Sequence, residues 1–163
     1  DRNGRRNADE IRFWRHYIDG AGPWLVDDKG RAGGLDAGAS FVVAGDLNLD
    51  PGDGEGRHAA IRALLAHPRI QDPGQTSKGG GEAAARPGGA NAAQEGDPTR
   101  DTADWRDRPG PGNLRVDYVL PSADLRVVGG GVWWPAAATD PVDAARVAAA
   151  SDHRLVWVDL ELP

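Results

Sequence analysis

The chain has 163 residues and a formal net charge of −6, with 25 Asp and Glu against 19 Lys and Arg, so we expect one domain or part of one. Such an acidic chain lacks the basic face of a general nucleic-acid coat, although a bound divalent cation can invert the local field and keeps nucleic acid among the possible substrates. The absence of cysteine excludes disulfides, thiolate metal sites and cysteine nucleophiles, and no run approaches the ~20 apolar residues of a membrane span.

The first part of the chain predicts a loop, one helix and a second loop. Residues 1–6 are polar and basic, as is typical of a loop. Asn7 can cap a helix, and Glu10 completes a capping-box-like pattern three positions later. Apolar residues then recur at helical spacing up to Gly20, where we expect the helix to end. Residues 19–39 are rich in Gly and Asp and predict a loop. The apolar face of the helix consists of Ile11, Trp14, Tyr17 and Ile18.

The middle of the chain predicts a buried strand, a short helix and a long loop. Residues 40–45 form an apolar, β-branched run that predicts the strand, and a Gly/Asp/Pro loop follows at 46–55. Apolar residues at helical spacing predict a helix at 57–67, which Pro68 ends. Residues 71–113 are rich in Gly, Ala and Pro and predict one long Gly/Ala-rich loop. A loop of this length is uncommon in a compact domain and is usually functional or mobile.

The last part of the chain predicts mainly strands. Residues 114–120 partly alternate and predict one strand. Residues 125–128 and 132–134 predict two more, which three glycines join as a bulge or a tight turn. An Ala-rich helix at 142–150 and a closing strand at 154–162 complete the chain. Strands that follow one another among helices favour α/β or α+β layering.

The first polar cluster, Gly45-Asp46-Leu47-Asn48, follows the predicted strand at 40–45. In an extended segment Asp46 and Asn48 point to the same side. A carboxylate beside an amide can hold a hydrated divalent cation and position a phosphate oxygen or an attacking water. The alternative is an ordinary turn, because Gly, Asp and Asn are common turn residues.

Two further clusters accompany apolar strands. Asp117 lies within Arg115-Val116-Asp117-Tyr118, and a carboxylate in an apolar strand is costly to bury without a partner. Ser151-Asp152-His153 precedes the closing strand and offers a metal ligand beside a group that titrates near neutral pH. Asp117 could accept a hydrogen bond from His153 and fix its orientation. The alternatives are an edge strand with Asp117 facing water and a capped turn before the last strand.

The three clusters occur in a recognisable order between residues 45 and 153. Gly-Asp-x-Asn after a strand, Arg-x-Asp-Tyr within a strand and Ser-Asp-His before the closing strand resemble the endonuclease/exonuclease/phosphatase family. This family includes abasic-site endonucleases, DNase I-like nucleases, inositol-phosphate phosphatases and sphingomyelinases. The resemblance implies a four-layered α/β sandwich of the DNase I type. It also implies hydrolysis by in-line attack of water on phosphorus, assisted by Mg²⁺ or Mn²⁺.

Carried over motif by motif, the resemblance assigns roles to five residues. Asp46 would orient or deprotonate the attacking water and, with Asp152, bind the metal. Asn48 would hold the substrate phosphate and the nucleophile. His153 would contact the phosphate and stabilise its developing charge, with Asp117 as its carboxylate partner. The choice between the Asp and the His as general base stays open, whereas the need to neutralise charge on the phosphoryl oxygens is general.

The resemblance also implies residues that this sequence does not supply. The family's first-strand Asn and main metal-binding Glu have no counterpart before Gly45, and the chain contains no Met. We therefore expect residues 1–163 to be the C-terminal part of a single domain. Its N-terminal half would be the partner that completes the site, either upstream of Asp1 or on another chain.

Two functions stay open at this level: a metal-dependent phosphoesterase, and a non-catalytic binding or assembly module of the same fold. Arg154 follows the Asp-His pair and is either substrate-binding or salt-bridged. The loop at 71–113, which Trp105 is expected to pin down, lies between the motifs and can shape the substrate pocket. Without a basic stripe, a small ester or nucleotide is favoured over long nucleic acid. The same absence, with the lack of Cys, favours an extracytoplasmic bacterial enzyme.

Overall fold

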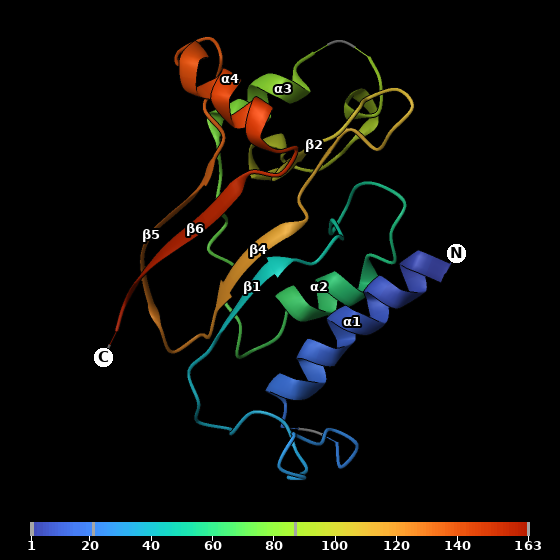
Figure 1. Cartoon of the computed structure of the whole chain (residues 1–163), viewed down its shortest axis with the longest axis vertical. Coiled ribbons are helices and arrows are strands. Elements are labelled where there is room, and N and C mark those ends of the chain that lie inside the picture. Colours follow the sequence, from blue (N-terminus) through green and yellow to red (C-terminus); the bar gives the residue numbers. More distant parts are fainter. Residues whose placement is uncertain (1, 21, 87, 163) are drawn as a thin grey trace.

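The computed structural model describes residues 2–20, 22–86 and 88–162. It is a mixed α/β structure in which short strand pairs lie among four α-helices (Figure 1), so the predicted α/β class is confirmed. The helices are α1 (Arg2–Ile18), α2 (Ala59–Leu65), α3 (Lys78–Ala84) and α4 (Pro141–Ala150), with 3₁₀ turns η1 (Asn91–Ala93) and η2 (Pro98–Arg100). The strands are β1 (Val42–Asp46), β2 (Ala103–Asp104), β3 (Asn113–Leu114), β4 (Asp117–Pro121), β5 (Arg126–Trp133) and β6 (Leu155–Glu161).

The strands pair antiparallel, two by two. β1 pairs with β4, β2 with β3, and β5 with β6. In the first pair Asp46 lies opposite Asp117, and Val42 lies opposite Pro121. β6 contacts β4 and runs beside it (Figure 1), so the two longer pairs lie side by side. The four-layered sandwich stays a prediction, because these pairs and their helices supply no second stacked sheet among the described residues.

One face of β1 and β4 carries the main core. Because side chains alternate along a strand, Val43, Tyr118 and Leu120 all point to the side where α1 and α2 lie. Burying each Leu or Ile side chain there contributes roughly 1.5–3 kcal/mol. The cluster is completed by Ala8, Ile11, Ile18, Leu49, Ala60, Ile61, Leu64 and Ile70. This packing brings the C-terminal end of β1 and the start of β4 to one edge of the core.

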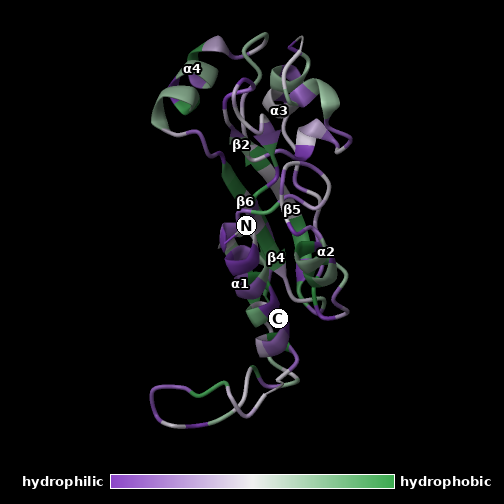
Figure 2. Cartoon of the chain, turned by 90° about the vertical axis from the view of Figure 1, so that its right-hand side faces the viewer, coloured by the Kyte–Doolittle hydropathy of each residue, from purple (hydrophilic) through white to green (hydrophobic). Residues whose placement is uncertain are grey.

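The opposite face of the strands is open. Val42 on β1, Trp133 on β5, and Leu155 and Trp157 on β6 are between 40% and 67% exposed. In Figure 2 the strands are mostly coloured hydrophobic, whereas α1 is mostly hydrophilic. Several large apolar side chains therefore face solvent on this side. Of the helices that the structure describes, none is both long and apolar enough to cross a membrane.

The first helix is longer than the sequence predicts. α1 begins at Arg2, so the prediction of a loop was wrong for residues 2–6, as was that of Asn7 as the cap, while residue 1 lies outside the described residues. The Asn7 side chain instead donates to the carbonyl oxygen of Asn48 at 2.9 Å, which ties the helix to the loop after β1. The helix ends two residues before Gly20, whose φ of 66° suits glycine.

The sequence predicts one long loop over residues 71–113, but the structure contains regular elements there. These residues contain α3, both 3₁₀ turns, β2 and the start of β3. The Ser77 side chain accepts from Gly80 N–H at 3.1 Å and caps α3. Its glycines allow close packing, because a Cβ on Gly79 would lie 2.3 Å from Trp134 Cδ1 and one on Gly80 would lie 2.4 Å from Pro98 O. A larger residue at Gly79 or Gly80 would clash with these atoms.

The two strands predicted around the triple glycine form one strand. β5 runs through Gly129, Gly130 and Gly131, and its register with β6 shifts between Val127 and Gly129. The division into two strands was therefore wrong, and the irregularity lies just before the glycines, which themselves pair in regular register with β6. Trp157 lies across these glycines, since a Cβ on Gly131 would lie 3.2–3.3 Å from its indole.

Candidate active site

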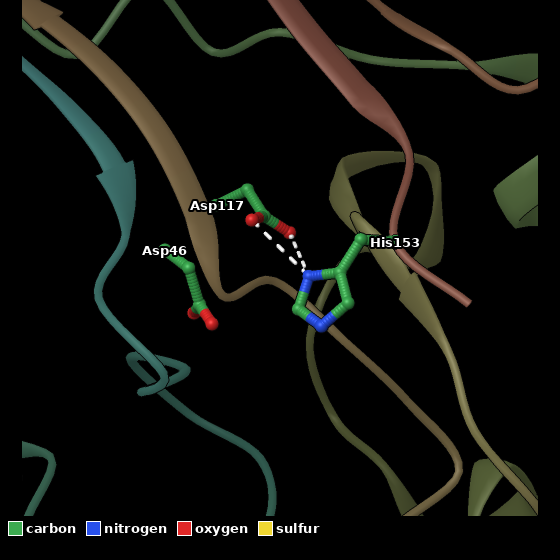
Figure 3. A group of neighbouring side chains, drawn as sticks. All are labelled: Asp46, Asp117 and His153. Carbon is green, nitrogen blue, oxygen red and sulfur yellow. Dashed lines mark hydrogen bonds and ion pairs between the residues drawn. The ribbon is translucent and has the colours of Figure 1, made fainter. Parts of the chain in front are cut away.

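Three titratable side chains that are distant in sequence meet at one edge of the strands (Figure 3). Asp46 is the last residue of β1, Asp117 is the first residue of β4, and His153 lies just before β6. One ligand atom from each lies within 4.8 Å of the others. The register that places Asp46 opposite Asp117 and the contact between β4 and β6 together create this arrangement.

Asp117 and His153 form the pair expected from the sequence. The His153 ring Nδ1 lies 2.9 Å from Asp117 Oδ2 and 3.2 Å from Oδ1. With Nδ1–H donating to the carboxylate, the ring orientation is fixed and Nε2 is left for another partner. Asp117 is thus half-buried and paired with a histidine, and it does not face water unpaired as an edge-strand residue would.

Thr102 supports this pair and was not singled out by the sequence. Its side chain is almost fully buried, and its Oγ1 accepts from the backbone N–H of Val116 and Asp117, each at 2.9 Å. The Thr102 hydroxyl also hydrogen-bonds the Asp117 side chain. The start of β4 is therefore held by a side chain from the segment that the sequence presents as loop.

Burial is the largest single influence on the pKa of both partners. It raises the pKa of the Asp117 carboxyl, which stays above its usual value although His153 and Thr102 hydrogen-bond it. Burial alone would lower the pKa of His153, but the hydrogen bond and charge of Asp117, together with Asp46, raise it above the usual value. The pair therefore retains a proton to higher pH than the separate groups in water.

Asn48 occupies a turn beside Asp46. Its backbone has φ 48°, in the left-handed region that few residues other than glycine adopt. Its N–H donates to Asp46 Oδ1 at 2.7 Å. The expectation of an extended segment with both side chains on one side was therefore wrong in its backbone geometry, and the turn alternative describes it. Asn48 and Asp46 nevertheless line the same opening.

Asp152 lies beside the group of three and is not part of it. Its Oδ2 accepts from the indole Nε1–H of Trp105 at 3.0 Å. The Trp105 ring meets the His153 ring edge to face, with centroids 5.4 Å apart. The metal pair Asp46 and Asp152 that the sequence suggests is therefore not the cluster that the structure brings together. The role of Asp152 stays a prediction.

Trp105 belongs to a segment that pairs with the Asp-His dipeptide along the backbone. Ala103 forms an isolated bridge with His153, and Asp104 N–H donates to Asp152 O at 2.8 Å. The sequence indicated that Trp105 anchors its loop, but nothing in its pattern identified residues 152 and 153 as the anchor. That contact joins positions 47 residues apart.

Arg154 is buried and paired with an aspartate. Its side chain is only 2% exposed, and Nη2 lies 2.9 Å from Asp104 Oδ2. Its guanidinium carbon also lies 4.5 Å from the centroid of the Trp134 ring. Of the two interpretations that the sequence allows, salt bridging describes this geometry and direct substrate contact does not. A buried arginine with these partners stabilises the segment that carries His153.

The group Asp46, Asp117 and His153 fits a divalent cation chemically. Two carboxylates face each other across β1 and β4, and a cation between them would offset their repulsion. Carboxylate oxygens suit Mg²⁺, and a set that includes imidazole also suits Mn²⁺. The donor set is thus compatible with the cofactors that the sequence suggests.

The comparison with protein families agrees with the site. The family model of the endonuclease/exonuclease/phosphatase family matches residues 2–153, so the chain belongs to that family. Its members are in general metal-dependent phosphoesterases. The match begins at the first turn of α1, well before the first motif recognised in the sequence. No curated protein and no solved structure matches the chain.

Proposed function

We propose that this protein is a metal-dependent phosphoesterase that hydrolyses a phosphate ester or phosphodiester by in-line attack of water. The observation that carries the proposal is the meeting of Asp46, Asp117 and His153 at the strand ends within the family match. A bound Mg²⁺ or Mn²⁺ would act as a Lewis acid and neutralise charge on the phosphoryl oxygens.

The residues of the chain then take distinct parts. Asp46 orients the attacking water and accepts its proton, and Asn48 holds the phosphate and the nucleophile. His153 keeps a proton because Asp117 raises its pKa, so Nε2–H can donate to a phosphoryl oxygen as charge develops there. Asp152 and Asp46 are the proposed metal-binding residues, and Trp105 holds the Asp152 carboxylate in place.

The open face of the strands supports a further part of the proposal. We propose that an N-terminal half of the domain, on the same protein or on a second chain, covers Val42, Leu155 and Trp157. That half would contribute the Asn and Glu that complete the metal site. The competing function, a non-catalytic binding module of the same fold, predicts that no such Asn and Glu occur in the upstream coding sequence.

A substrate panel tests the proposal. The protein from its complete reading frame is assayed with Mg²⁺ or Mn²⁺ against phosphomonoesters and phosphodiesters, beside Asp46→Ala and His153→Ala. Each variant should lose roughly 10²–10⁴-fold in kcat/KM, the usual contribution of a positioned acid or base. Asp28→Ala and His16→Ala, both exposed, are the matched controls. Equal hydrolysis by all five proteins would show that the site is elsewhere.

A further inference from the structure

A cleft of about 830 Å³ adjoins the proposed active site. It lies between the loop after β1 and the loop after β2, with the first turns of α1 at one side. Asn48 and Asp152 are among its lining residues, so the cleft opens directly beside the groups proposed to act on phosphate. Its position makes it the natural place for the organic group of an ester.

The lining of this cleft is strongly acidic. Asp50 and Asp53 accept hydrogen bonds from backbone N–H groups, which satisfy their oxygens without adding a positive charge. Asp104 is the one lining carboxylate paired with a cation, Arg154, in the part of the chain that the structure describes. Five carboxylates and one guanidinium line the cleft, from Asp50, Asp53, Glu55, Asp104, Asp152 and Arg106.

The cleft also has an apolar wall. Trp105 is half-buried and lines it, as do Pro109 and Pro111 on one side and Leu114 at the base. An indole held by its Nε1–H on Asp152 presents a rigid surface to a ligand. Aromatic faces bind flat apolar groups and, more strongly, organic cations.

We infer that the cleft selects a small phosphoester with a single phosphate and an uncharged or cationic organic group. The inference rests on the proposed function and narrows its substrate class. A strand of nucleic acid lying in this cleft, and not in the opening lined by Arg2, Arg5 and Arg6, would bring neighbouring phosphates against the carboxylates of Asp53 and Glu55, and nucleic-acid binding depends on cationic contacts with phosphates. A single phosphate, in contrast, can lie at the metal site while its organic group lies against Trp105.

Charge reversal at the rim provides the test. Glu55 is exposed on the cleft and lies outside the proposed catalytic machinery. With Mn²⁺ present, kcat/KM is measured for p-nitrophenyl phosphorylcholine, bis(p-nitrophenyl) phosphate and a short single-stranded oligodeoxynucleotide. The unmodified protein should prefer both small esters. Glu55→Lys should shift the ratio towards the oligonucleotide by about fourfold at low salt, as for two charge units at about 10 Å in water.

Asp28→Lys makes the same charge change on an exposed loop whose residues do not line the cleft, and it should leave the ratio unchanged. Salt dependence is an independent readout. Each additional phosphate that the Glu55→Lys protein neutralises should steepen the log–log slope for oligonucleotide binding by about 0.7.

A binding measurement separates the two proposals. Anisotropy of a labelled oligonucleotide with His153→Ala reports affinity without hydrolysis, and weak binding at physiological salt is expected. A preference of the unmodified protein for the oligonucleotide would overturn the inference while leaving the phosphoesterase intact. Hydrolysis of none of the three substrates would overturn the phosphoesterase proposal, and the substrate class with it.

Discussion

Two clusters of charged side chains adjoin the start of β4, and they differ in charge balance. Asp46, Asp117 and His153 meet on the open side, where two carboxylates lie near one imidazole that hydrogen-bonds Asp117. On the other side, Asp72 is gripped by Arg115, with Nη1–Oδ2 at 2.8 Å and Nη2–Oδ1 at 2.6 Å. Arg100 also reaches Asp72, at 2.6 Å. The first cluster has unused capacity for a cation, whereas in the second the Asp72 carboxylate is already paired with two arginines.

The pKa shifts express the same contrast. Burial favours the protonated form of both aspartates, and at Asp117 this effect prevails and the pKa stays raised. At Asp72 the hydrogen bonds and charge of Arg115 outweigh burial and lower the pKa to about 2. An aspartate with arginine partners stabilises the fold, while one with a histidine partner is poised for proton and metal chemistry.

Removing Arg115 from its pair with Asp72 should have the largest effect on the free energy of unfolding. Arg115→Met leaves Asp72 with Arg100 as its cationic partner and also removes the contact of Arg115 over the Tyr118 ring. We expect a loss of about 3 kcal/mol, the lower end for breaking a buried pair, because Arg100 remains. Urea unfolding followed by circular dichroism measures the loss. A change below about 1 kcal/mol would show that the pair of Arg115 and Asp72 contributes little to stability.

Removing the carboxylate charge from the active cluster should affect activity more than stability. Asp117→Asn keeps the shape but cannot hold the His153 imidazolium in the same way, so kcat/KM should fall about 10–100-fold, as for other residues that orient a ligand. Because Asp117 raises the pKa of His153, the His153 ring should also titrate at lower pH in this variant, as measured by NMR. An unchanged His153 titration would contradict the pairing.

A third aspartate, Asp101, should make the stability of the fold depend on pH. Asp101 is almost fully buried, and burial, together with the charges of Asp50, Asp53 and Asp97, raises its pKa to about 8. The folded state therefore holds this proton more tightly than the unfolded state. The contribution of this proton to the free energy of unfolding is fully present below about pH 4. It is lost by up to about 1.4 kcal/mol per pH unit as pH rises from there through 8. Asp72 acts oppositely, and its contribution is lost as pH falls towards 2.

The Asp101→Asn variant should flatten the decline in stability between pH 5 and 9, as seen in thermal unfolding across that range. The amide keeps the size of the side chain but cannot ionise. If the variant and the unmodified protein lost stability in parallel as pH rises, another group would be responsible.

The smallest effect is expected for a charge pair exposed to solvent. Arg126 and Glu161 pair across β5 and β6, with both side chains more than half exposed. Arg126→Met should change the unfolding free energy by less than about 1 kcal/mol, which makes it the matched control for Arg115→Met. A loss as large as that of Arg115→Met would contradict the expectation that the buried pair contributes more to stability than the exposed one.

The sequence predicts the parts of the fold that depend on local pattern. Apolar runs predict β1, β4 and β6, and the order of the motifs groups Asp46, Asp117 and His153, which the structure brings together. Prediction from the sequence failed where tertiary contacts decide which structure a segment adopts. α3 is a glycine-rich segment of weak helix propensity, and it forms where Gly79 and Gly80 pack closely on Trp134 and Pro98.

The supporting residues of the site were hidden for the same reason. Thr102 and Trp105 lie in a Gly- and Pro-rich stretch, and their partners Asp117 and Asp152 are 15 and 47 positions away. Single-sequence patterns carry no signal for such contacts. For Arg154 the sequence leaves substrate contact and salt bridging open, and its buried side chain pairs with Asp104.

Metal dependence of hydrolysis tests the central claim most directly. The chelated protein is titrated with Mn²⁺ while hydrolysis of bis(p-nitrophenyl) phosphate is followed, in the unmodified protein and in Asp46→Ala. We predict no turnover without metal, saturable recovery in the unmodified protein, and a recovery at least about 100-fold smaller in the variant. Turnover that persists after chelation, or equal recovery in the two proteins, would contradict a metal-dependent site that contains Asp46.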